Sequence, residues 1–196
     1  TTARPEADVV LTESTYAGTS HEDRNRVEQR FVESVRTTIW DGGTVVVPAF
    51  AIGRTQEMLM LLAANDIDCY LDGMGTEVTR LLRRHPEFLR DHDALKRASA
   101  NARTVTGRDG QRERIADTNT VIVTTAGMLN GGPALSYIPE IRSHPTNKIL
   151  LTGYQVEGTP GRELLEYGRP PGDDGVVPVS AQVEQYDLPA NDDHEG

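Results

Sequence analysis

The chain has 196 residues, enough for one full core or for one domain plus part of another. Its composition, with 37% hydrophobic and 26% charged residues, is that of an ordinary soluble globular protein. No run of eighteen apolar residues is present, so the sequence predicts no membrane span. Cys69 is the only cysteine, which excludes a disulfide framework and predicts a buried, inert thiol. The first residues show no signal-peptide pattern, so the cytoplasm is the expected compartment.

The charge balance is strongly acidic, with a formal net charge of −10 at pH 7. Only Lys96 and Lys148 are lysines among the 20 basic residues, against 30 acidic ones. Such a surface suits concentrated salt, where the Debye length falls to roughly 3 Å at 1 M and repulsion of a polyanion is screened. Two interpretations stay open: a halophilic protein that can still bind a polyanion, or an acidic protein that binds no nucleic acid.

Short β-branched segments alternate with amphipathic ones along the chain. Apolar residues recur at helical spacing in residues 22–40, whereas residues 44–47 form an unbroken apolar run typical of a buried strand. The same reasoning predicts further strands at 9–11, 69–71, 120–124, 148–151, 176–179 and 181–186, the last two as a hairpin, and further helices at 54–64, 76–84, 133–141 and 161–167. Residues 86–117 are polar and predict one or two short helices with loops. The alternation predicts an α/β fold with a parallel sheet covered by helices on both faces.

Four strand-to-helix loops are rich in glycine or hydroxyl groups: 13–16, 48–55, 124–133 and 152–162. Ligands on parallel sheets bind at the carboxyl ends of the strands, and helix starts with glycine attract phosphate. The alternative is that these glycines only make tight turns. No P-loop, dinucleotide fingerprint or GxSxG elbow is present, and the five histidines are far apart in sequence, so the chain itself predicts no metal site.

Five segments together resemble one family. They read VVLTESTY (9–16), VVPAFAIGRTQE (46–57), DGM (72–74), GMLNGGP (127–133) and GYQVEGTPGR (153–162). Their order and spacing are similar to those of the β-CASP family of metallo-β-lactamase-fold ribonucleases, in particular the archaeal mRNA 3′-end processing factors related to cleavage and polyadenylation specificity factor nucleases. The resemblance covers most of the chain apart from about residues 86–118.

The resemblance implies a Rossmann-like β-CASP domain inserted into a metallo-β-lactamase domain of αββα fold. Residues 1–13 would end the N-terminal lactamase part, 14–146 would form the β-CASP domain, and 147–196 would return into a truncated lactamase fold. Two zinc ions in the full-length parent would activate a water. Their ligands are expected upstream of Thr1, so this chain alone is expected to bind no metal and to be inactive.

Family roles carry over only where the residues match. Glu13 aligns with an acidic residue that orients a histidine, but the histidine position of the motif DLPANDD is occupied by Asn191, which cannot shuttle a proton near neutral pH. The residues expected to hold the RNA backbone or to lie near it are Arg54, Thr125, Gly127, Met128, Gly131 and Arg162.

The resemblance thus implies a zinc-dependent ribonuclease acting on single-stranded RNA, with a homodimer or an RNA-processing complex as further partners. The alternative suggested by Asn191 is a non-catalytic RNA-binding or scaffold homologue. A third hypothesis is an unrelated Rossmann-like domain that binds a nucleotide cofactor.

Overall fold

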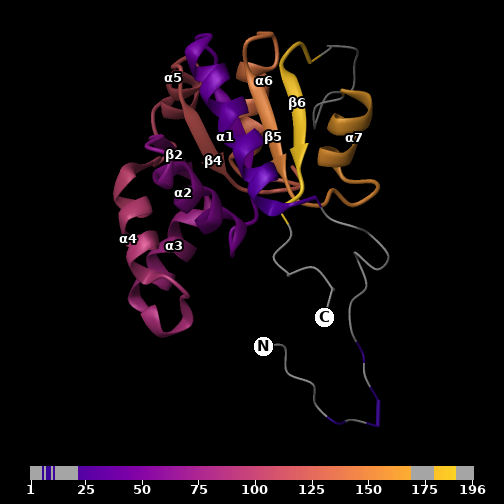
Figure 1. The fold of residues 1–196 in the computed structure, drawn as a ribbon. Coiled ribbons are helices and arrows are strands. Elements are labelled where there is room, and N and C mark those ends of the chain that lie inside the picture. Colours follow the sequence, from indigo (N-terminus) through magenta and orange to yellow (C-terminus); the bar gives the residue numbers. More distant parts are fainter. Residues whose placement is uncertain (1–5, 7, 10, 12–21, 169–178, 189–196) are drawn as a thin grey trace.

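The computed structural model describes residues 6, 8, 9, 11, 22–168 and 179–188, in which helices and strands alternate (Figure 1). The elements in chain order are α1 (Arg24–Trp40), β1 (Val45–Pro48), α2 (Arg54–Ala64), β2 (Cys69–Asp72), α3 (Met74–Arg84), the 3-10 turn η1 (Pro86–Phe88), α4 (His92–Asn101), β3 (Ala102–Thr104), α5 (Gln111–Ala116), β4 (Val121–Thr124), α6 (Ala134–Ile141), β5 (Lys148–Thr152), α7 (Pro160–Tyr167) and β6 (Gln182–Tyr186).

The strands form one six-stranded sheet in the order β3-β2-β4-β1-β5-β6. Every neighbouring pair is parallel, for example β1 with β4, where Val45 lies opposite Val121. The carboxyl ends of all six strands therefore lie along one edge of the sheet, called the carboxyl edge below. The predicted α/β fold with a parallel sheet is confirmed.

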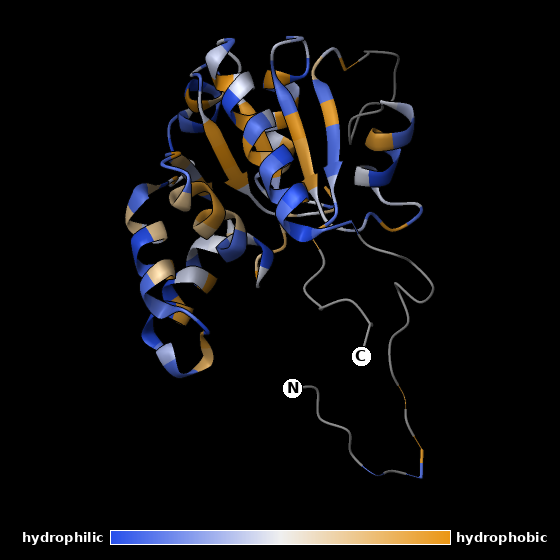
Figure 2. Cartoon of the chain, viewed as in Figure 1, coloured by the Kyte–Doolittle hydropathy of each residue, from blue (hydrophilic) through white to orange (hydrophobic). Residues whose placement is uncertain are grey.

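Helices pack on both faces of the sheet because the central strands are apolar on both sides. Val45 and Val47 of β1 face a core shared with α1, α2 and α4, whereas Val46 faces a second core shared with α5, α6 and α7. Burying each such side chain contributes about 1.5–3 kcal/mol. The central strands are accordingly hydrophobic, while the outward faces of the helices are mostly polar (Figure 2).

The first helix illustrates how the sequence sets this packing. Val27, Phe31 and Val35 of α1 are buried against the sheet, as their helical spacing predicts. Asp23 caps the helix by accepting a hydrogen bond from the backbone N–H of Arg26 at 3.0 Å, which satisfies one of the donors left unpaired at a helix start.

Three sequence expectations differ from the structure or fall partly outside the described residues. Val9 and Leu11 are almost fully exposed and lie in no strand, because they pack against nothing in the described residues. The predicted hairpin at 176–186 is described only from residue 179, and its second strand, β6, pairs in parallel with β5. The domain boundary at 146/147 stays a prediction, and β5 and β6, which follow it, belong to the same sheet as β1.

A polar network attaches the edge strand β6 to its neighbours. The Lys148 ammonium donates to Ser34 Oγ at 3.0 Å and to a Glu184 carboxylate oxygen at 2.7 Å, and the Ser34 and Tyr186 hydroxyls donate to the other oxygen of Glu184. Burial opposes the charged form of Glu184, but these hydrogen bonds outweigh it and lower its pKa. The network thereby links α1, β5 and β6 through groups far apart in sequence.

Cys69 lies in β2 with its thiol buried, and burial, together with the nearby Asp68 carboxylate, raises its pKa to about 12. The predicted inert thiol fits this environment, because the thiolate is the reactive form. Within the described residues, no helix has the length and apolar character needed to cross a membrane.

Candidate functional site

Three of the four predicted loops meet at the carboxyl edge. The β1–α2 loop (49–53), the β4–α6 loop (125–133) and the β5–α7 loop (153–159) follow neighbouring strands. Thr152 donates to the Pro48 carbonyl at 3.1 Å, and the backbone N–H of Gly161 donates to the Met128 carbonyl at 3.0 Å. The predicted convergence is therefore found for these loops, whereas Glu13 and Asn191 lie outside the described residues.

The β4–α6 loop is the centre of this arrangement and carries four of the predicted site residues. The buried Thr125 hydroxyl accepts a hydrogen bond from the Met74 N–H at 3.3 Å, and the Gly131 carbonyl accepts one from the Ala126 N–H at 3.2 Å. A Cβ at Gly127 would lie 2.9 Å from the backbone nitrogen of Phe50, so only glycine lets these two loops approach so closely. The polar atoms of this loop thus hold neighbouring loops in place.

Gln155 connects two of the loops from within. Its side chain is fully buried, and its Nε2 donates to the carbonyls of Gly127 at 3.2 Å and Gly153 at 3.3 Å. A Cβ at Gly161 would lie 2.0 Å from the Gln155 Oε1, so a glycine at this position makes room for the amide. The GYQ segment marks this loop in the sequence, but its pattern does not reveal that the glutamine is buried.

Arg54, expected near RNA, already has partners within the chain. Its guanidinium donates hydrogen bonds to the Leu188 carbonyl, which follows β6, and to the Glu57 carboxylate. The Glu57 carboxylate also accepts a hydrogen bond from Arg24. The Arg54 side chain is only 13% exposed. This geometry fixes the start of α2 against the end of β6, and a contact of Arg54 with RNA stays a prediction.

Arg162 lies in the first turn of α7, where its backbone N–H is capped by the Thr159 hydroxyl. Its guanidinium donates to the Glu166 carboxylate at 2.7 Å one helical turn later. Both groups are partly exposed, and such pairs contribute little to stability. Arg162 is thus near the β5–α7 loop, and its role in RNA binding is a prediction as well.

A buried carboxylate at the end of β2 was not among the predicted site residues. Asp72 accepts hydrogen bonds from Arg112 Nε at 2.7 Å, from a second Arg112 nitrogen at 3.2 Å and from the Tyr137 hydroxyl at 2.8 Å. Burial, and then the Asp72 carboxylate, raise the pKa of Tyr137, so its hydroxyl remains a donor. This network joins β2, α5 and α6 next to Gly73, the single residue between β2 and α3.

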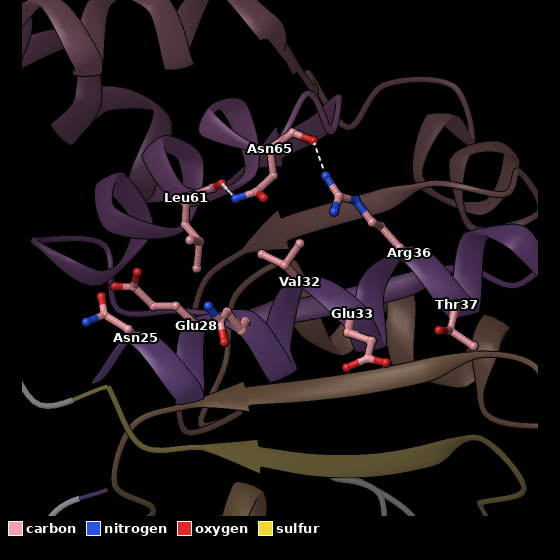
Figure 3. Close-up of a pocket in the computed structure, with 9 residues that line it drawn as sticks. Asn25, Glu28, Val32, Glu33, Arg36, Thr37, Leu61 and Asn65 are labelled. Atoms are coloured by element: carbon pink, nitrogen blue, oxygen red, sulfur yellow. Dashed lines mark hydrogen bonds between the residues drawn. The ribbon is translucent and has the colours of Figure 1, made fainter. Parts of the chain in front are cut away.

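A groove of about 370 Å³ lies elsewhere, between α1 and α2. Figure 3 shows Val32 and Leu61 in it, surrounded by polar side chains. Arg36 donates to the Asn65 carbonyl at 2.9 Å, and Asn65 donates to the Leu61 carbonyl at 2.9 Å. Because these lining groups bond to one another and no family motif reaches the groove, the carboxyl edge is the stronger candidate site.

The described residues do not fit a zinc site. No three histidine, cysteine, aspartate or glutamate side chains of that part of the chain are grouped so that they could hold a metal ion. The described residues therefore do not form a complete metal site on their own.

The fold is thus that of an α/β domain with a parallel sheet, a class in which ligands generally bind at the carboxyl ends of the strands. The chain belongs to the Beta-Casp domain family, whose profile matches residues 55–164. That match begins in α2 and ends in α7, so it includes the β4–α6 and β5–α7 loops.

Curated relatives share this part of the chain. Probable RNase MJ4 of Methanocaldococcus jannaschii is 37% identical over 171 residues, which cover 85% of this chain and 40% of the relative. RNase aCSPSF2 of Saccharolobus solfataricus is 39% identical, with 93% and 37% covered. Transcription termination factor FttA of Thermococcus kodakarensis is 32% identical, with 93% and 32% covered. The chain thus spans at most two fifths of the length of these relatives.

Proposed function

We propose that this chain is the β-CASP part of a zinc-dependent ribonuclease that hydrolyses RNA phosphodiester bonds in mRNA 3′-end processing or RNA decay. Single-stranded RNA would lie across the carboxyl edge. The observation that carries the proposal is the meeting of the β1–α2, β4–α6 and β5–α7 loops at that edge, held together by Gln155 and Thr152. The names of the relatives MJ4 and aCSPSF2, both called RNases, support the same activity.

In this proposal the described residues bind and orient RNA, and the metal chemistry belongs to the remainder of a longer protein. Zinc would supply an activated water when bound there. The β4–α6 loop is suited to an RNA backbone because glycines allow close approach and because α6 begins directly after it. Zinc dependence and cytoplasmic location are parts of the proposal.

The alternative is a non-catalytic RNA-binding or scaffold subunit. It is favoured by Asn191, which stands where the family motif has histidine. Loss of a proton-transferring group typically slows a reaction by about 10²–10⁴-fold, so a homologue with this replacement could retain binding alone.

The test uses the full-length protein that contains this chain, incubated with single-stranded RNA with and without a chelator. Cleavage that stops with the chelator and returns with zinc supports the ribonuclease. RNA binding without cleavage, combined with a gain of cleavage in Asn191→His, supports the scaffold homologue. A protein that neither binds nor cleaves RNA contradicts both.

A further inference from the structure

The carboxyl edge has an unusual composition for an RNA site in an acidic protein. The loop that follows the edge strand β3 contains Arg108 and Asp109. The loops that follow the four inner strands β2, β4, β1 and β5 are residue 73 and residues 125–133, 49–53 and 153–159, all within the described residues. Glu157 is their only charged residue, although 26% of the whole chain is charged. Nothing in these loops offers a lysine or arginine to a phosphate.

Three arginines beside the inner loops are already engaged, whereas Arg108, after β3, is exposed. Arg54 donates to Leu188 and Glu57, Arg112 donates to Asp72, and Arg162 donates to Glu166. Moving Arg112 away would leave the buried Asp72 carboxylate without its cationic partner. Few cations are therefore available beside the inner loops for phosphate recognition, which supplies most of the salt-dependent affinity of nucleic-acid-binding proteins.

Exposed apolar side chains occupy this edge instead. Phe50 and Ile52 follow β1, Met74 follows β2, and Tyr154 and Val156 follow β5. The two rings are 41% (Phe50) and 43% (Tyr154) exposed. Aromatic rings at this exposure offer a face on which unpaired bases can stack, an interaction that tolerates any base because each has a π-face.

The loop around Phe50 is held rigidly, which favours stacking. The Phe50 carbonyl accepts hydrogen bonds from the Thr55 N–H at 3.0 Å and the Thr55 hydroxyl at 2.7 Å. A Cβ at Gly127 would lie 3.3 Å from a Phe50 ring carbon, so the ring lies directly against the β4–α6 loop. A ring fixed in this way loses little conformational freedom on binding.

We propose that the carboxyl edge holds single-stranded RNA by stacking unpaired bases on Phe50 and Tyr154, and not by pairing phosphates with arginine or lysine. This inference rests on the proposed function, because it specifies how the same edge recognises RNA. It also explains how a chain of net charge −10 can bind a polyanion at high salt, where stacking persists and ionic attraction is screened.

The test measures binding of a short fluorescent single-stranded RNA to the 196-residue chain by anisotropy over a salt series. Each phosphate neutralised by a cation contributes a slope of about −0.7 in log K against log salt for single strands, so the expected slope is smaller in magnitude than about 1. An abasic ribose-phosphate chain of equal length should bind far more weakly, since it has the charge but no bases.

Ring substitutions complete the test. Phe50→Leu and Tyr154→Leu should each weaken binding by about 5- to 150-fold, because stacking on an aromatic side chain contributes about 1–3 kcal/mol per base, whereas Phe50→Tyr keeps the ring and the affinity. Trp40→Leu is the matched control, because Trp40 is 90% exposed but ends α1 at the opposite edge of the sheet. Unchanged melting temperatures would show that the variants are folded.

Three results would overturn the inference while RNA binding itself stands: a steep salt slope, equal affinity for the abasic chain, or leucine variants that bind like the wild type. The last result would assign the apolar side chains to a protein partner. If the wild-type chain binds no RNA at any salt concentration, this inference is wrong, whereas the proposed function is decided by RNA binding and cleavage in the full-length protein.

Discussion

Replacing Tyr137 by phenylalanine tests whether the Asp72 network holds the end of β2 in place. The change removes one hydroxyl and keeps the ring, which is fully buried in α6. The lost interaction is the 2.8 Å hydrogen bond to the Asp72 carboxylate. Hydrogen bonds to charged groups contribute about 1.5–3 kcal/mol, and Asp72 keeps both bonds from Arg112. We therefore expect a loss of about 1.5–2 kcal/mol, at the low end of that range.

Urea unfolding followed by circular dichroism measures this loss as a lower midpoint with an unchanged m value. The melting temperature should fall by about 3–8 °C for a chain of this size. Because Asp72 is buried, the loss should be similar at low and high salt.

Tyr70→Phe is the matched control for Tyr137→Phe. Tyr70 lies in β2 beside Asp72, and its ring contacts the Arg103 guanidinium, but its hydroxyl makes no hydrogen bond with the described residues. Its removal should change the free energy of unfolding by less than about 0.5 kcal/mol. Equal effects of the two substitutions would refute the role assigned to the Asp72 network.

Three further predictions follow from other contacts. Hydrogen bonds from Lys148 and its neighbours lower the pKa of Glu184 below 4.5, so the stability linked to this carboxylate is complete above that pH and is lost as the pH falls through the folded-state value. In Glu184→Gln, the free energy of unfolding should therefore fall less steeply as the pH drops below about 4.5. An unchanged pH dependence in this range would contradict the prediction. Gly161→Ala should cost about 1–3 kcal/mol, but much less in a Gln155→Ala background, and additive losses in the double variant would argue against a clash with the amide. Cys69, whose pKa is raised to about 12, should react with a thiol reagent at pH 8 only as fast as the chain opens, and rapid reaction of the folded chain would show an accessible thiol.

The regular part of the fold could be predicted because burial and periodicity agree there. The helix predicted at 54–64 coincides with α2, and the runs of β-branched residues predicted β1 and β4 to within one or two residues. The edge strand β3 could not be predicted in the same way. It consists of Ala102–Thr104, none of which is fully buried, so it shows neither an apolar run nor an alternation of apolar and polar residues.

The candidate site was predictable in position but not in detail. Parallel strands bring their following loops to one edge whatever the order of the strands, so the meeting of the loops follows from the alternation alone. The partners of single side chains do not follow from it. Arg54 bonds to Leu188 across 134 positions in the sequence, and Arg112 bonds to Asp72 across 40. Such pairs depend on the order of strands in the sheet, which periodicity does not determine.

The polar network around Lys148 has a practical consequence for labelling the protein. Lys148 is bound to Glu184 and its side chain is 13% exposed, whereas Lys96, the only other lysine, is exposed on α4. Amine-reactive dyes attack unprotonated, accessible amines, so Lys96 should be the more reactive of the two lysines of this chain at mildly alkaline pH. A fluorophore or surface linker attached to this chain through an amine should thus be placed mainly on α4.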